Sequence, residues 1–240
     1  MLILKNIFVY IGSRNQNSRL FKHVETILET IKVKHRGNIN IDVFSPLNTN
    51  LYPSTGCKNC FEKGFCPNEQ SINDEGKFIK EKMENADVII LASPVYSHNV
   101  SSDMKVLIDR LSYWGHLFKL AGKAGMVITT AESNGANFVS DYLEKTLSFM
   151  GACVELKTNF VNSESDLVDS YIREAAETLE RLCSPEYSAS STSGQEVTFQ
   201  TYKLILKDYP KDHFEYKYWE ENEFFNYQSY EELLNEYVKT

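Results

Sequence analysis

The stretch that decides the fold is "VIILASPVYSHNVSSDMKVLIDRL", residues 88–111. It opens with an unbroken apolar run, which is typical of a parallel strand buried between two layers of helices. The run stops at Ser93 and Pro94, and a short polar loop with Tyr96 follows. From Ser101 onward apolar residues recur at helical spacing, and Ser101 itself can cap the helix. The stretch therefore predicts a strand, a loop with an aromatic side chain, and a helix.

The same alternation continues on both sides of this stretch. Strands are expected at Ile3–Ile11, Ile39–Phe44, Asp87–Ala92, Ala124–Thr130 and Cys153–Phe160. Helices are expected at Ser18–Lys34, Asp74–Asn85, Ser101–Phe118, Ser133–Met150 and Ser165–Cys183, with caps at Ser18, Ser101, Ser133 and Ser165. The pattern predicts an α/β fold with a doubly wound, five-stranded parallel sheet and right-handed crossovers.

We expect the strand order 2-1-3-4-5 for this sheet. In open parallel sheets, ligands bind beyond the carboxyl ends of the strands, where the strand order reverses. The reversal here lies between the first and third strands, so the loops that follow them are expected to flank one crevice.

A composition change near Cys183 predicts the domain organisation. Residues 1–183 form the predicted main domain, and "SPEYSASSTSGQ", residues 184–195, is a small-residue linker. Residues 196–240 form an acidic, aromatic extension with at least two helical patterns separated at Tyr209 and Pro210. Its many aromatic side chains need to be buried. They indicate either a helical appendage packed on the main domain, or a dimer contact or active-site cover.

Composition excludes several classes of partner. The chain has 240 residues and a net charge of −8, so no overall basic field favours nucleic acid or anionic lipid. No apolar run reaches the roughly 18 residues of a membrane span. The apolar start, Met1 to Ile11, is too short for a signal peptide. Five cysteines without a secretory signal indicate a cytoplasmic protein with reduced thiols.

Three loops are expected at the carboxyl edge of the sheet. The first, "GSRNQNS" at residues 12–18, is a strand-to-helix turn whose amides and helix N-terminus form an anion site, although an ordinary capped helix start has the same pattern. In the second loop Pro94 holds a rigid turn that presents Tyr96 and backbone amides to a flat ring. The third, "TTAESNGAN" at residues 129–137, is small and polar. Together they suit a phosphate, a planar heterocycle and a connecting polyol, as in FMN.

These motifs resemble the flavodoxin-like NADPH-dependent FMN reductase family over about residues 1–183. The most specific part is Pro94, Val95 and Tyr96, followed in register by Lys105, Ile108, Asp109 and Arg110. The first motif differs from the family's, because Arg14 lies one position early and Asn15 stands where arginine is usual.

The resemblance implies a flavodoxin-like fold and an FMN-dependent oxidoreductase that takes hydride from NAD(P)H and reduces a small acceptor, namely a flavin, a quinone, or a nitro or azo compound. It implies a homodimer or homotetramer. The flavin carries the redox chemistry, so no catalytic acid–base pair is expected. The residues expected to bind FMN are Ser13, Arg14, Asn15, Asn17, Ser18, Pro94, Val95, Tyr96, Ser97, His98, Asn99, Thr130, Ala131 and Gly135.

Four side chains near these motifs have alternative interpretations. His98 is either a proton donor or simply solvated. Asp109 and Arg110 are interpreted as ion-pairing or interface groups, and Trp114 as a core residue rather than a flavin or subunit contact.

A cysteine-containing loop, Pro46–Ser71, follows the second strand, and loops of this length are usually functional or disordered. Cys57, Cys60 and Cys66 resemble the loop of the iron–sulfur flavoprotein branch of the superfamily. A [4Fe–4S] cluster takes four thiolates, and Ser54 occupies the position where the spacing would continue. The alternatives are a zinc site, a reversible disulfide between Cys57 and Cys60, or three free thiols.

Two other functions remain open beside the reductase. The first is an electron carrier of the flavodoxin or iron–sulfur flavoprotein type, which acts with protein partners. The second is a scaffold that has lost its flavin.

Overall fold

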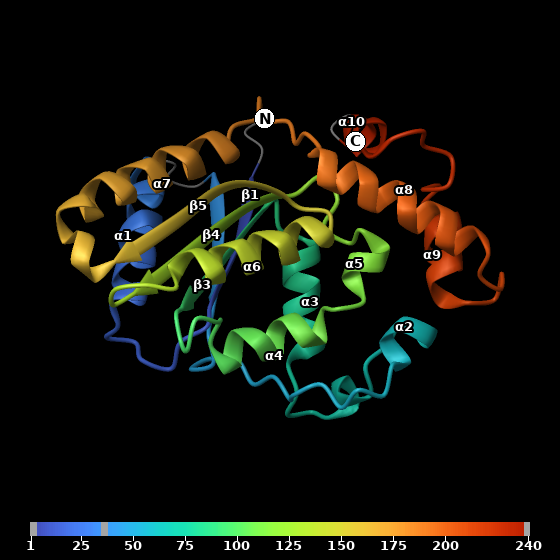
Figure 1. The fold of residues 1–240 in the computed structure, drawn as a ribbon, viewed down its shortest axis with the longest axis horizontal. Coiled ribbons are helices and arrows are strands. Elements are labelled where there is room, and N and C mark those ends of the chain that lie inside the picture. Colours follow the sequence, from blue (N-terminus) through green and yellow to red (C-terminus); the bar gives the residue numbers. More distant parts are fainter. Residues whose placement is uncertain (1–3, 35–37, 238–240) are drawn as a thin grey trace.

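The computed structural model describes residues 4–34 and 38–237. Five parallel strands form one sheet in the order β2-β1-β3-β4-β5, which confirms the predicted topology (Figure 1). The start of the first predicted strand, Ile3, lies outside the described residues. The strands are β1 Lys5–Ile11, β2 Ile39–Phe44, β3 Val88–Pro94, β4 Ala124–Ala131 and β5 Cys153–Val161.

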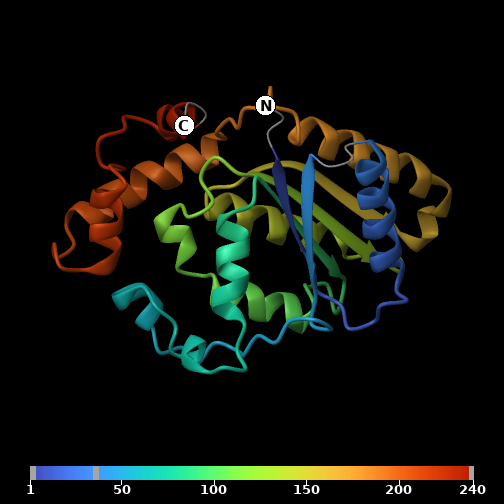
Figure 2. The ribbon, with the colours of Figure 1, turned by 180° about the vertical axis from the view of Figure 1, so that it is seen from behind.

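Helices cover both faces of the sheet because successive strand residues point to opposite sides. Ile7 and Val9 of β1 pack against α1 (Arg19–Lys34) and α7 (Val168–Leu182). Phe8 and Tyr10 of the same strand face the opposite helical layer. Figure 2 shows the blue helix α1 on one side of the sheet and the teal and green helices of this layer on the other. That layer consists of α3 Gly76–Glu84, α4 Ser102–Arg110, α5 Trp114–Leu117 and α6 Ala136–Phe149.

The predicted helix Ser101–Phe118 is wrong as one element, because α4 ends at Arg110 and α5 begins at Trp114. The apolar spacing runs through the break, since Leu107 before it and Trp114 after it are buried in the same core cluster. Spacing alone therefore could not show where the backbone turns.

Two of the four predicted caps are confirmed and two are wrong. The side chains of Ser18 and Ser101 accept hydrogen bonds from the first-turn amides of α1 and α4. Ser133 does not cap α6, because Gly135 is the N-cap, and Ser165 lies within the 3₁₀ segment η2, Asn162–Leu167, ahead of α7. Serine is common both at caps and in loops, so the residue type does not distinguish these places.

The aromatic extension packs on the end of the main body where β4 and β5 begin (Figure 1). It consists of α8 Ser193–Lys207, α9 Phe214–Glu221 and α10 Tyr230–Tyr237. Trp219 Nε1 donates to the carbonyl of His116 at 2.8 Å, and the Tyr230 hydroxyl donates to that of Gly151 at 2.6 Å. The extension is therefore a packed appendage. It does not cover the three loops of its own chain, because they lie at the opposite ends of the strands.

The segment between the main body and the extension makes specific contacts. Ala189 is buried, and the amide of Ser191 donates to Glu231 of α10 at 2.6 Å. Thr192 and Gln195 form a capping box at the start of α8. Within residues 4–34 and 38–237, no helix combines the length and apolarity needed to cross a bilayer.

Candidate functional site

The three predicted loops meet at the carboxyl ends of β1, β3 and β4. The amide of Gly12, at the start of the first loop, donates to the carbonyl of Ala92 at 2.8 Å. The amide of Val95, in the second loop, donates to the carbonyl of Thr130 at 2.9 Å. Neighbouring loops are thus tied to one another through backbone hydrogen bonds, and they form one continuous edge.

Gly12 brings the first loop against the start of α4. A Cβ atom at this position would lie 2.8 Å from both Met104 Cβ and Ser101 Oγ, closer than real Cβ contacts occur. The amide of Ser101 in turn donates to the buried Ser93 hydroxyl at 3.1 Å. The first loop can therefore approach the second only because residue 12 has no side chain.

The second loop contains a strained two-residue turn. Tyr96 and Asn99 exchange backbone hydrogen bonds of 3.0 Å, and between them Ser97 and His98 adopt φ values of 50° and 60°. Tight hairpin turns with two positive φ angles favour Asn-Gly or Gly-Gly, so serine and histidine here carry a conformational cost. Such strain concentrates at ligand-binding sites. The Tyr96 side chain is 59% exposed beside this turn.

The third loop packs directly against this turn through Gly135, which has φ 83°. A Cβ atom at Gly135 would lie 3.0 Å from His98 Nδ1 and from Val95 Cγ1. Thr130 and Ala131, at the end of β4, are buried beneath the two loops. The second and third loops therefore form one packed unit.

Side chains of the first loop mostly hold the loop itself. Ser13 Oγ accepts from the amide of Asn15 at 3.2 Å, and Asn15 Oδ1 accepts from the amide of Asn17 at 3.0 Å. Ser18 Oγ caps α1 by accepting from Phe21 N at 3.3 Å. The turn therefore stands over the N-terminus of a 16-residue helix, an arrangement that favours anions.

Arg14 of the first loop and Arg19 of α1 both pair with carboxylates of neighbouring elements. Arg14 makes a two-point ion pair with Asp103 of α4, with Nε–Oδ2 and Nη2–Oδ1 distances of 3.0 and 2.8 Å. This bond raises the pKa of Arg14, which stays 71% exposed at its side chain. Arg19 pairs with Glu132 of the third loop. The two guanidinium groups thus link the first loop to α4 and the start of α1 to the third loop.

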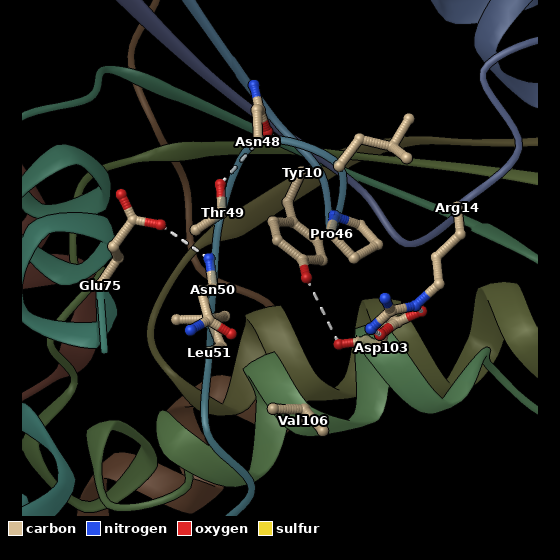
Figure 3. Close-up of a pocket in the computed structure, with 11 residues that line it drawn as sticks. Tyr10, Arg14, Pro46, Asn48, Thr49, Asn50, Leu51, Glu75, Asp103 and Val106 are labelled. Atoms are coloured by element: carbon tan, nitrogen blue, oxygen red, sulfur yellow. Dashed lines mark hydrogen bonds and ion pairs between the residues drawn. The ribbon is translucent and has the colours of Figure 1, made fainter. Parts of the chain in front are cut away.

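A cavity of about 280 Å³ lies beside the Arg14–Asp103 pair (Figure 3). Tyr10 of β1 points into it, and its hydroxyl donates to the Asp103 carbonyl at 3.5 Å. Burial raises the pKa of Tyr10. Glu75 accepts from the amide of Asn50 at 2.7 Å on the opposite wall. Sequence patterns did not indicate this cavity, because Tyr10 has the spacing of an ordinary strand residue and residues 46–51 carry no motif.

The residues assigned structural roles behave as expected. Arg110 is buried and pairs with Asp74, with Nη1–Oδ2 and Nη2–Oδ1 distances of 2.7 and 2.8 Å. It also donates to the carbonyl of Tyr52 at 2.9 Å, which ties the cysteine loop to α4. Asp109 pairs with Lys105 on the helix surface, and Trp114 is fully buried in the core.

The cysteine loop is folded around two short helices, α2 (Asn59–Lys63) and η1 (Pro67–Gln70). Cys57 is exposed, and hydrogen bonds from Thr55 and Asn59 lower its pKa to about 7. Cys60 is half-buried, and this burial raises its pKa. Across residues 4–34 and 38–237, no three His, Cys, Asp or Glu side chains are grouped so that they could hold a metal ion. Three loop thiols also fall one short of the four that a [4Fe–4S] cluster takes.

Comparison with known proteins assigns the chain to a family. The family model for NADPH-dependent FMN reductase matches residues 6–166. The chain belongs to this family. Membership confirms the predicted family and agrees with the predicted class of enzyme, an FMN-dependent oxidoreductase.

Several similar proteins are named iron–sulfur flavoproteins. One from Archaeoglobus fulgidus is 36% identical over 98 residues, which are 40% of this chain and 43% of that protein. One from Clostridioides difficile is 25% identical over 196 residues, 78% of this chain and 80% of that protein. The chain spans about half the length of the first two curated relatives it matches.

Solved structures confirm the fold. An apo NADH:FMN oxidoreductase (EMOB) has a TM-score of 0.55 and 22% identity, and the match covers 80% of this chain and 93% of that one. An FMN-dependent NADH-azoreductase from Bacillus anthracis, in complex with FMN, has a TM-score of 0.58 and 13% identity. That match covers 76% of this chain and 100% of the other.

Proposed function

We propose that this protein is an FMN-dependent NAD(P)H oxidoreductase that reduces a small acceptor such as a flavin, a quinone, or a nitro or azo compound. The observation that carries the proposal is the strained turn at Ser97 and His98, packed on Gly135 beside an anion-favouring loop. Family membership supports it. FMN, when bound, accepts hydride at its N5 atom and passes electrons on.

The chain's own contribution is to bind and orient FMN. The N-terminus of α1 and the amides of Arg14 and Gln16, which take no part in the internal bonds of residues 12–18, would bind the phosphate. Ser13, Asn15, Asn17 and Ser18 hold that loop in shape. The side-chain oxygens of Ser13, Asn15 and Ser18 are engaged within the loop, as are the amides of Asn15 and Asn17, so the helix N-terminus would dominate the phosphate contact. Arg14 supplies positive charge at the rim.

The second and third loops orient the ring. Pro94 and Val95 position the turn, and the amides of Ser97 and His98 would bond the ring edge, since those of Tyr96 and Asn99 donate to each other's carbonyls. Thr130, Ala131 and Gly135 support the turn from the third loop. His98 borders the ring site, where an imidazole can hold a proton near the reacting atoms.

We also propose a domain organisation, a cellular compartment and an oligomeric state. The main domain spans residues 1–183, and residues 184–195 join it to the extension at residues 196–240. Five free thiols are consistent with a reducing, cytoplasmic compartment. A homodimer or homotetramer is proposed from the family resemblance.

The test is an absorption spectrum of protein purified under anaerobic conditions, before and after NADPH or NADH is added. Flavin bands that bleach on addition support the oxidoreductase. Bands that persist until dithionite is added favour the electron carrier instead. A protein that takes up no added FMN contradicts the proposal.

The iron–sulfur flavoprotein relatives favour the electron carrier as a second candidate. The residues present do not fit its four-thiolate cluster, because the cysteine loop holds only Cys57, Cys60 and Cys66. Iron and sulfide analysis of the same anaerobic sample separates the two candidates.

A further inference from the structure

Phe138 is an exposed aromatic residue at the edge of the candidate site. It lies in the first turn of α6, directly after the third loop, and its side chain is 65% exposed. Single exposed apolar residues need no explanation in general. Phe138 differs from a scattered surface residue because it adjoins the proposed ring-binding turn.

Its position is set by that turn. The rings of Phe138 and His98 meet edge to face, with centroids 5.6 Å apart and an interplanar angle of 68°. The close approach of Gly135 to His98 brings the first turn of α6 to this place. Phe138 is therefore held beside the ring site by the same packing that shapes the strained turn.

A cavity of about 370 Å³ opens at this point, and we call it the Phe138 cavity. It is lined by His98, Phe138 and Tyr142, which carry rings, and by Asn99, which carries a side-chain amide. Ring walls offer offset or edge contacts to a flat aromatic molecule. The imidazole and the amide can donate hydrogen bonds to carbonyl or nitro oxygens. The volume lies in the range of small-molecule sites.

We propose that the Phe138 cavity is the acceptor subsite and that Phe138 determines specificity for planar aromatic acceptors of the quinone class. This inference rests on the proposed oxidoreductase function and deepens it. A quinone gains a hydride, which the nicotinamide donor loses by way of FMN, and one proton from solvent. It leaves as the hydroquinone, while the donor leaves as its oxidised form.

The test compares two acceptors in Phe138→Ala with FMN bound. The probe is 2-methyl-1,4-naphthoquinone, and ferricyanide serves as an acceptor that needs no stacking surface. We expect the KM for the quinone to rise about tenfold, the size of a lost aromatic contact, with the ferricyanide rate unchanged. Phe138→Tyr should restore the quinone KM. Val197→Ala, at an exposed position on α8, is the matched control and should change neither.

Five results would overturn the inference. An unchanged quinone KM in Phe138→Ala, in a wild-type protein that turns over, overturns it while the proposed function stands. The inference is also overturned if the ferricyanide rate of Phe138→Ala falls as much as its quinone activity, or if its FMN affinity is weaker. A changed sedimentation coefficient of this variant has the same consequence. Phe138 would then act on the flavin or on a subunit contact. A wild-type protein that binds no FMN overturns both proposals.

Discussion

A Cβ atom placed on Gly135 would lie 3.0 Å from Nδ1 of His98. This relationship joins two loops that are separated in sequence by the whole of α4, α5 and β4. It explains why residue 135 carries no side chain, and its φ of 83° is a left-handed value that glycine adopts without strain. The proposed ring site thus depends on the packing of the Gly135 backbone against the side chains of His98 and Val95.

Gly135→Ala tests this packing. The new methyl group requires both a left-handed alanine and movement of His98, so we expect a loss of about 1–2 kcal/mol in unfolding free energy. FMN affinity should fall as well, because the strained turn moves. Urea unfolding and flavin fluorescence titration measure the two effects.

The matched control is Gly194→Ala on α8. A Cβ there meets only Thr192 Oγ1, at 3.9 Å, and alanine favours a helix more than glycine does. This variant should be as stable as the wild type or more so. Equal losses from both glycine substitutions would contradict the role of Gly135.

Asp103→Asn tests the pairing of Arg14. The change removes a carboxylate from the rim and frees the guanidinium, so we expect tighter binding of FMN and unchanged binding of riboflavin, which lacks the phosphate. Arg14→Gln should act in the opposite direction on FMN only. Fluorescence titrations at low and high salt measure this, and equal shifts for both flavins would argue against a phosphate role.

Asp74→Asn should destabilise the protein by about 3 kcal/mol, because it leaves the buried Arg110 with only its longer ion pair, 3.3 Å, to Glu69. Asp109→Asn is the control, since its pair with Lys105 is exposed and contributes at most about 0.5 kcal/mol. Urea unfolding at neutral pH compares the two. Similar small losses of unfolding free energy in both variants would mean that the Asp74–Arg110 pair does not hold the cysteine loop to α4.

The Asp74 pair also predicts an acid dependence. Burial alone would raise the pKa of Asp74, but hydrogen bonds from Arg110 and from the amides of Tyr52 and Gly76 lower it below its usual 3.8. Its stabilisation is therefore present above pH 3.8 and is lost as pH falls through the lower, folded-state value. In Asp74→Asn, the free energy of unfolding should fall less steeply with decreasing pH in the acid range. An unchanged acid dependence of the unfolding free energy would rule out the Asp74 carboxylate as its source.

Cysteine reactivity should follow burial. Cys57 is exposed with a pKa of about 7, whereas burial raises the pKa of Cys153 to about 12 and that of Cys183 to about 11. Iodoacetamide should therefore label Cys57 first, with a rate that rises through pH 7. Mass spectrometry of timed samples locates the label. Cys57→Ser should abolish the fast phase, and a fast phase that persists would place the reactive thiol elsewhere.

The sequence by itself determined the sheet and the location of the three loops. Strands buried on both faces are apolar throughout, so Val88–Ala92 and its counterparts were recognisable without tertiary information. Caps such as Ser18 act over a few residues and were also predictable. The assignment of individual FMN contacts stays a prediction.

Only the tertiary structure decided which distant groups meet. Arg14 pairs with Asp103, and Arg110 pairs with Asp74. The break between α4 and α5 could not be predicted from residue spacing, because both helices face the same core. The aromatic extension lies at the amino ends of β4 and β5, and Phe138 lies beside His98. The physical reason is the range of the interactions. The spacing of residue types reflects interactions between residues close in sequence, whereas these contacts join residues that only the folded chain brings together.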